Sequence, residues 1–117
     1  MRDHKELDVW RESVDVVVKG YALTKSFPKE EIYGLTNQMR RAAVSIPSNI
    51  AEGAARQTEK EFVQFLYISL GSATELETQI LIAEKRSFTQ IAGELLRQIA
   101  MVQKMLHGLI RHYRNKV

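Results

Sequence analysis

The last third of the sequence carries positively charged side chains at a spacing that suits contacts with phosphates. Arg97, Lys104 and Arg111 recur every seven residues, so they lie on one side of a helix. The candidates for nucleic-acid binding are Arg97, Lys104, His107, Arg111, Arg114 and Lys116. Lysine and arginine that neutralise phosphates release counterions and need no contact with the bases. The spacing therefore predicts sequence-independent binding of RNA or DNA.

The charge is distributed unevenly along the chain. Residues 85–117 carry 7 basic side chains and one acid, Glu94, whereas residues 1–84 carry 10 basic and 13 acidic side chains. This asymmetry favours one electropositive face. Two alternatives stay open: a solvated face that complements the helix dipole, and ion pairs with another subunit or with acids such as Asp8, Glu12 and Asp15. No recognition-helix turn, zinc-ligand spacing or aromatic stacking platform is apparent, so sequence-specific reading of DNA is not expected.

A second set of polar side chains surrounds Pro47. These residues are spaced by four or seven along a helical segment, which places them roughly on one side. The set is Arg41, Ser45, Asn49, Glu52 and Arg56. As a cluster they would contact a ligand or another subunit. The alternative is a bend with ion pairs inside the helix, each worth roughly 0.2–0.5 kcal/mol.

No arrangement of residues indicates catalysis or metal binding. His107 and His112 are five residues apart and do not share a helical face, and no Glu-x-x-His motif accompanies them. Ser72 in "LGSATE" lacks the second glycine of a nucleophile elbow. There is no cysteine and no glycine-rich phosphate loop. We therefore expect no enzymatic activity, catalytic residue, metal, cofactor or small-molecule substrate.

The elements that position these residues follow from the hydrophobic pattern. Apolar residues recur at spacings of three and four in four segments, which predicts helices at 8–26, 29–55, 58–85 and 89–115. Pro28, the capping box of Thr58 and Glu61, and Thr89 or Ser87 mark the helix starts. Short connections predict one all-α domain over residues 1–117, an antiparallel up-down-up-down four-helix bundle.

Pro47 lies in the middle of the second predicted helix. It lacks an N–H group and displaces the carbonyl of Ala43, so a break between two helices is one possibility. The apolar series keeps its phase from Ala42 through Ile46 to Ile50, which favours one helix kinked at Pro47. Polar side chains nearby, including Ser45, Ser48 and Asn49, would then satisfy the disturbed backbone.

Two segments carry more apolar surface than a single bundle buries. From Phe62 to Leu70, seven of nine residues are apolar or aromatic and surround the helix. In the first helix, whose predicted core series is Leu7, Trp10, Val14, Val17 and Tyr21, a second apolar stripe lies opposite. The predicted interface of a homo-oligomer is Val9, Val16, Leu23, Phe65 and Ile68. The alternative is scattered exposed apolar residues, which are normal singly.

The stretch "YGLTNQMRRAAVSIPSNIAEGAAR" closely resembles the signature of the bacterial 23S rRNA-intervening sequence proteins, a family of four-helix bundles. Trp10, the "FP" between the first two helices and "EFVQFLYISLGSATELETQ" extend the match over nearly the whole chain. The resemblance implies a pentameric homo-oligomer. A related branch, the accessory proteins of diversity-generating retroelements, implies RNA, DNA and a reverse transcriptase as partners. The sequence does not identify the partner or the gene's context.

The sequence also bears on the cellular compartment. The segment "MRDHKELDVW" has no apolar signal core, and no stretch approaches the 18 apolar residues of a membrane span. With no cysteine, a reducing environment fits. We therefore expect a cytoplasmic protein without a membrane partner.

Overall fold

The fold consists of four helices, seen in a computed structural model that describes residues 2–116. The helices are α1 (Asp8–Thr24), α2 (Leu35–Ala54), α3 (Glu59–Lys85) and α4 (Gly93–Arg114). Two short 3-10 helices, η1 (His4–Glu6) and η2 (Lys29–Glu31), precede α1 and α2. No strand occurs in the described part of the chain, so the predicted all-α four-helix fold is confirmed.

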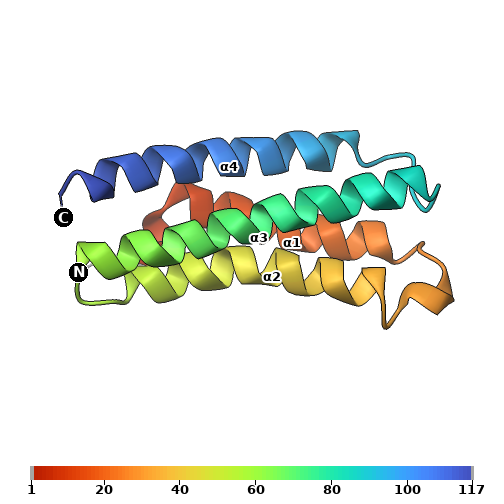
Figure 1. Cartoon of the computed structure of the whole chain (residues 1–117), viewed down its shortest axis with the longest axis horizontal. Helices are drawn as coiled ribbons and strands as arrows, with labels where there is room; N and C mark the ends of the chain where they lie inside the picture. The colour runs from red at the N-terminus through yellow and green to blue at the C-terminus, as the bar shows by residue number, and fades with distance from the viewer. Residues whose placement is uncertain (1, 117) are drawn as a thin grey trace.

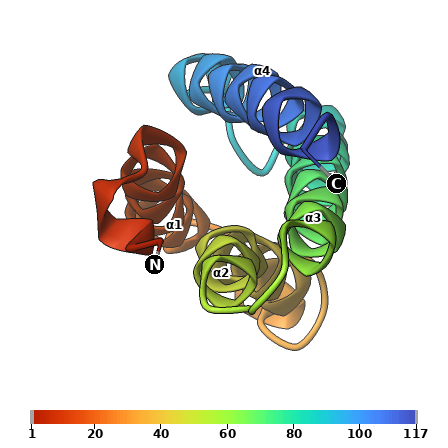
Figure 2. The ribbon, with the colours of Figure 1, turned by 90° about the vertical axis from the view of Figure 1, so that its left-hand side faces the viewer.

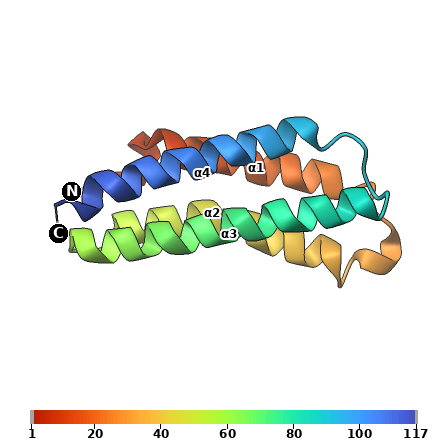
Figure 3. The ribbon, with the colours of Figure 1, turned by 45° about the horizontal axis from the view of Figure 1, so that its top comes forward.

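The bundle is a rod with extents of 45 × 23 × 19 Å. In Figure 1, α1 and α3 run from left to right, and α2 and α4 run back. Figure 2 shows the helices around a common axis in chain order, so α2 and α4 lie diagonally opposite. Figure 3 shows both turns at one end, the α1–α2 turn and the α3–α4 turn, next to each other. The rings of Phe27 and Phe88, from these two turns, lie 5.7 Å apart.

The helix starts were predicted correctly at α3 and wrongly at α2 and α4. Thr58 caps α3 by accepting from the Glu61 backbone N–H at 3.1 Å. The α2 helix begins at Leu35 instead of residue 29, because the chain turns at Gly34 and the Glu31 carboxylate accepts the Leu35 N–H at 3.2 Å. The α4 helix begins at Gly93, and Thr89 instead accepts the Ile91 N–H at 3.3 Å within the preceding turn.

Ser87 ends α3 in an unusual conformation. Its φ of 60° lies in the left-handed region, which costs a residue with a Cβ roughly 1–2 kcal/mol. Here the Phe88 N–H donates to the Ala83 carbonyl at 2.9 Å, which closes the end of the helix. Glycine is the usual residue at such a position.

We expect Ser87→Gly to raise the free energy of unfolding by about 0.5–1 kcal/mol, because glycine adopts a positive φ without steric cost. Urea denaturation of the variant and of the original chain measures the difference. A matched control is Ser48→Gly, at an exposed position inside α2. There glycine should destabilise by a similar amount. If both variants are destabilised, the strain at Ser87 is not significant.

Three of the four predicted core faces are confirmed within α2, α3 and α4. Ile32, which the sequence placed first in the core series of the second helix, is instead 52% exposed, because α2 begins only at Leu35. Met39, Ala42, Ile46 and Ile50 of α2 are at most 5% exposed. On α3, the buried members of the predicted series are Phe62, Ser69, Ala73, Leu76, Ile80 and Ala83. On α4, Leu95, Ile99, Val102 and Leu106 are buried.

The predicted core face of α1 is wrong. Val9, Val16 and Leu23, expected on the outside, are only 5%, 0% and 8% exposed, whereas Tyr21 is 40% exposed. The buried stripe also contains the small residues Ser13 and Gly20. A Cβ atom at Gly20 would lie 3.9 Å from the Ala43 Cβ, so α1 approaches α2 closely on this side. Because Ser13 and Gly20 are small, α1 can pack closely against α2 on this face, and this face is the one that is buried in the core.

The α2 helix is continuous through Pro47. Asn49 Nδ2 donates to the Ser45 carbonyl at 2.8 Å, within the turns that contain Pro47. The buried Ser69 hydroxyl of α3 donates to the Ile46 carbonyl at 2.9 Å, a contact that the α2 sequence gave no sign of. One helix across Pro47 is therefore correct, and the kink stays a prediction.

Candidate nucleic-acid interface

The predicted cationic residues lie on the outer side of α4 and just beyond its end. We call them the α4 stripe: Arg97, Lys104, His107, Arg111, Arg114 and Lys116, all of which are exposed. Arg97 to Arg114 spans about 25 Å at 1.5 Å per residue. Lys116 follows the helix, and its ammonium group lies 5.5 Å from the centre of the Tyr113 ring.

The cations of the α4 stripe make no ion pair within residues 2–116, where the ion pairs involve Arg2, Arg11, Lys19 and Arg56 instead. Arg114 donates to the Tyr67 hydroxyl at 3.2 Å, a neutral partner. No carboxylate among the described residues therefore neutralises the lysines and arginines of the stripe.

The acids of α1 are engaged elsewhere. Gln98 Nε2 of α4 donates to Glu12 at 3.0 Å and to Asp15 at 2.8 Å. Lys19 Nζ lies 3.1 Å from Asp15 Oδ2, and Asp8 pairs with Arg11. The hydrogen bonds from Gln98 and then Lys19 lower the pKa of Asp15 below its ordinary value, and Asp15 raises the pKa of Lys19. The Gln98 hydrogen bonds join α1 to α4, and none of these contacts neutralises a cation of the α4 stripe.

The predicted polar cluster on α2 divides into two groups. In the first, Ser45 Oγ lies 2.8 Å from Ser72 Oγ of α3, and Asn49 Nδ2 donates to Ser45 Oγ at 2.8 Å. Arg41 is exposed beside this group. The Ser45–Ser72 contact joins α2 to α3, and the Asn49–Ser45 bond lies within α2.

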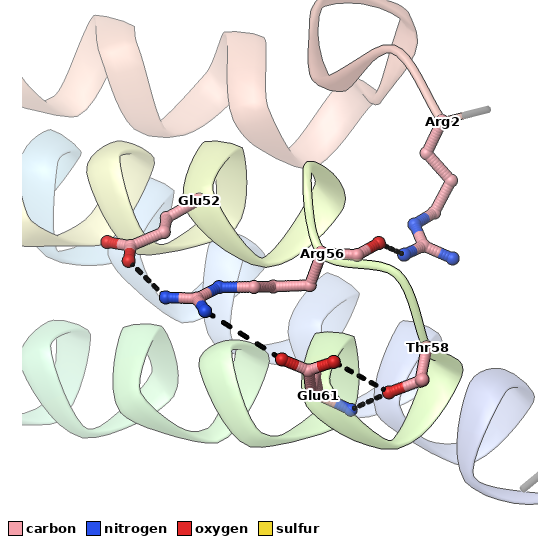
Figure 4. A network of polar contacts seen from close by, with 5 residues as sticks. All are labelled: Arg2, Glu52, Arg56, Thr58 and Glu61. Carbon is pink, nitrogen blue, oxygen red and sulfur yellow. Dashed lines mark hydrogen bonds and ion pairs between the residues drawn. The ribbon is translucent and has the colours of Figure 1, made fainter.

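The second group surrounds Arg56 at the α2–α3 turn (Figure 4). The Arg56 guanidinium lies 2.7 Å from Glu52 Oε2 and 3.7 Å from Glu61 Oε2. Glu61 also receives a hydrogen bond from the Thr58 hydroxyl at 3.1 Å. The Glu52–Arg56 pair joins the end of α2 to the turn, and the Glu61 contact ties the turn to the start of α3, a connection that neither interpretation of the cluster included.

Arg2 holds the chain start against this turn. Its guanidinium donates to the Arg56 carbonyl at 2.8 Å (Figure 4) and pairs with Glu59 at 3.2 Å. The same group lies 4.5 Å from the centre of the Phe62 ring and 6.0 Å from that of Tyr113. The role of Arg2 is not apparent from the sequence, because its partners are more than 50 residues away in the chain.

An apolar stripe remains uncovered on the outer side of α3. We call it the α3 stripe: Tyr67, Ile68, Gly71, Thr74, Thr78, Leu81 and Ile82, all of which are exposed. The hydroxyls of Thr74 and Thr78 donate to carbonyls one turn earlier at 3.0 Å, so they are occupied within the helix. Ile68 is 51% exposed and Phe65 is half-buried. Since Val9, Val16 and Leu23 are in the core, only the α3 part of the predicted oligomer interface is available at the surface.

In the part of the chain that the structure describes, no three His, Asp or Glu side chains lie close enough together to hold a metal ion. Among the same residues, no helix combines the length and apolar character needed to cross a bilayer.

The four-helix bundle agrees with the family resemblance that the sequence shows. A family model described as 23S rRNA-intervening sequence protein matches residues 5–108. The chain belongs to this family. Comparison with curated proteins finds no match.

A solved crystal structure has the same fold as this chain. It is a protein with unknown function from the S23 ribosomal protein family of Bacteroides thetaiotaomicron VPI-5482. The crystal structure has 23% sequence identity and a TM-score of 0.81, and the match covers 88% of this chain and 95% of that one. At this identity the similarity establishes the fold alone.

Proposed function

We propose that this 23S rRNA-intervening sequence protein is a non-catalytic homo-oligomer that binds nucleic acid, or a nucleoprotein, electrostatically through the α4 stripe. The observation that supports the proposal is a row of exposed cations without ion-pair partners in residues 2–116. Such a row attracts phosphates without selecting a sequence. In an oligomer, repeated copies of the row would strengthen binding further.

We expect binding to RNA and DNA to fall steeply with salt. If the four lysines and arginines within α4 each neutralise a phosphate, affinity for a duplex falls about 100-fold between about 50 and 200 mM salt. A mobility-shift titration at several salt concentrations, with two unrelated sequences, measures both the slope and the sequence preference. Affinity that is independent of salt, or confined to one sequence, would contradict the proposal.

The α3 stripe supports self-association, and the family resemblance suggests a pentamer. Exposed Ile68 and Leu81 lie on one apolar stripe that carries few charges, which is typical of a subunit interface. A ring closes by repeating one contact around an axis, so every copy of the stripe is covered.

We expect Ile68→Lys together with Leu81→Lys to weaken the assembly by at least about tenfold, because each introduces a charge into an apolar contact. Light scattering or analytical ultracentrifugation over a range of protein concentrations measures the mass. The matched control adds the same charges at exposed positions away from the α3 stripe, as Ser48→Lys and Ala100→Lys. A wild-type chain that is monomeric at all concentrations would exclude the interface.

A second candidate function is a protein–protein scaffold without a nucleic-acid role, and the uncovered α3 stripe is the observation that favours it. In this case a protein partner isolated with the chain should remain bound after nuclease treatment. Loss of the partner on nuclease treatment would instead favour the α4 stripe as the functional surface.

A further inference from the structure

The exposed side of α2 borders a polar pocket that the α4 stripe does not reach. The pocket is open, has a volume of about 520 Å³ and lies between α2 and α3. Its lining includes Tyr33 from the turn before α2, Asn37 and Arg41 from α2, and Glu75 from α3. Its volume is within the range of roughly 300–1,000 Å³ that small-ligand sites occupy.

Tyr33 provides an aromatic platform. The residue is 94% exposed, the most exposed large apolar or aromatic side chain in the described chain. It stands in the turn between η2 and α2, where it contributes little to the core. Since exposed aromatic rings are the usual surfaces for stacking unpaired bases, this ring suits a planar heterocycle.

Arg41 provides a positive charge that nothing else in residues 2–116 uses. Its neighbour Arg40 donates to the Thr24 hydroxyl at 2.9 Å and stacks 4.7 Å from the centre of the Tyr21 ring. Arg41 has no ion pair among the described residues and also borders a second open pocket on its other side. Its planar guanidinium is suited to a phosphate group.

The remaining groups suit the edge of a base or the hydroxyls of a ribose. Glu75 Oε2 accepts from Gln79 Nε2 at 3.1 Å, and its carboxylate can still accept an exocyclic N–H. Asn37 offers both a donor and an acceptor, and the Ser45 and Ser72 hydroxyls lie at the same pocket.

The charge balance of the pocket separates it from the α4 stripe. With one cation and one carboxylate, the lining of the pocket has no net charge, so it does not provide the long-range attraction for phosphates that the α4 stripe provides. It matches a ligand that has one anionic group, a flat ring and several hydrogen-bonding edges. We propose that this pocket binds a single nucleotide, with the base on Tyr33, the phosphate at Arg41 and the base edge or ribose toward Glu75. The nucleotide is either free or an unpaired residue of a strand.

The test uses the full chain and the four ribonucleoside monophosphates, with adenosine and inorganic phosphate for comparison. Calorimetry gives affinities, and ¹⁵N chemical-shift mapping identifies the residues contacted. We expect nucleotides to bind more tightly than adenosine or phosphate, with shifts at Tyr33, Asn37 and Arg41. A single-stranded hexanucleotide and a duplex of the same sequence then distinguish a strand from a free nucleotide.

Two variants test the roles of the side chains. Tyr33→Ala should weaken nucleotide binding about 5- to 100-fold through loss of stacking. Arg41→Ala should weaken it about 10- to 100-fold and remove the preference for nucleotides over adenosine. Because both residues are exposed, circular dichroism should show an unchanged helix content. Ile32→Ala, at the neighbouring 52% exposed residue, is the matched control and should bind as wild type.

The proposal fails if neither the nucleotides nor the hexanucleotide bind at millimolar concentration. It also fails if Tyr33→Ala and Arg41→Ala both bind as wild type. Binding by nucleotides supports a free ligand, and binding only by the hexanucleotide supports a strand. Alanine at the four α4 cations should leave mononucleotide binding unchanged, so this site and the α4 stripe can fail independently.

Discussion

Removing the four permanent charges within α4 is expected to lower the affinity for RNA at least about 100-fold at low salt. The variant carries alanine at Arg97, Lys104, Arg111 and Arg114. Each lost phosphate contact should also reduce the log–log salt slope by about one. The substitutions should leave the fold intact, because all four side chains are exposed and none forms an ion pair within residues 2–116.

A matched variant separates the position of these charges from their number. It loses the same net charge at four exposed lysines outside α4, which are Lys25, Lys29, Lys60 and Lys85. If binding depends on the α4 stripe, this variant should bind RNA nearly as tightly as the original chain. Equal losses in the two variants would mean that only the overall charge matters, and no loss in the first would exclude the stripe.

Gly53→Ala is expected to destabilise the fold by about 2 kcal/mol, even though alanine is the better helix former by about 1 kcal/mol. Gly53 is buried in the last turn of α2, on the side that faces α3. A Cβ there would lie 2.6 Å from the Phe65 Cβ and 3.1 Å from the Phe62 ring. Since the Phe65 Cβ is fixed by the α3 backbone, the helices must separate.

Thermal and urea unfolding measure this effect, and Gly108→Ala on α4 is the control. No atom lies within 4 Å of a Cβ at Gly108, so this change should stabilise by about 0.5–1 kcal/mol. Opposite signs for two identical substitutions would establish that the close contact at Gly53 outweighs helix propensity. A stabilised Gly53→Ala variant would show that α2 and α3 readjust without cost.

The periodicity of the apolar residues was enough to predict the four helices, because each helix buries one face and the capping box at Thr58 marks the start of α3. It did not determine which face of α1 is buried. Two apolar stripes fit equally well there, and the deciding contact, Gly20 against Ala43, lies between distant segments.

The sequence likewise predicted one part of the candidate sites and not another. Exposed cations on α4 follow from their spacing relative to Val102, which is buried. The Tyr33 platform was missed because Tyr33 was placed inside a helix that begins only at Leu35. Pro28 is a favourable residue for a helix start, but the turn at Gly34 and the Glu31 carboxylate, which accepts the Leu35 N–H, place the start of α2 at Leu35. The pattern of apolar residues does not distinguish between these two starts.

Arg2 places the beginning of the chain beside its last helix, within 6.0 Å of the Tyr113 ring. Both chain ends therefore lie at one end of the rod (Figure 1), while the α1–α2 and α3–α4 turns lie at the other. A short linker can join the ends, and a cut in the α3–α4 turn then yields a circular permutant that begins with α4. Such a rearranged chain presents the cationic helix first and keeps every helix–helix neighbour.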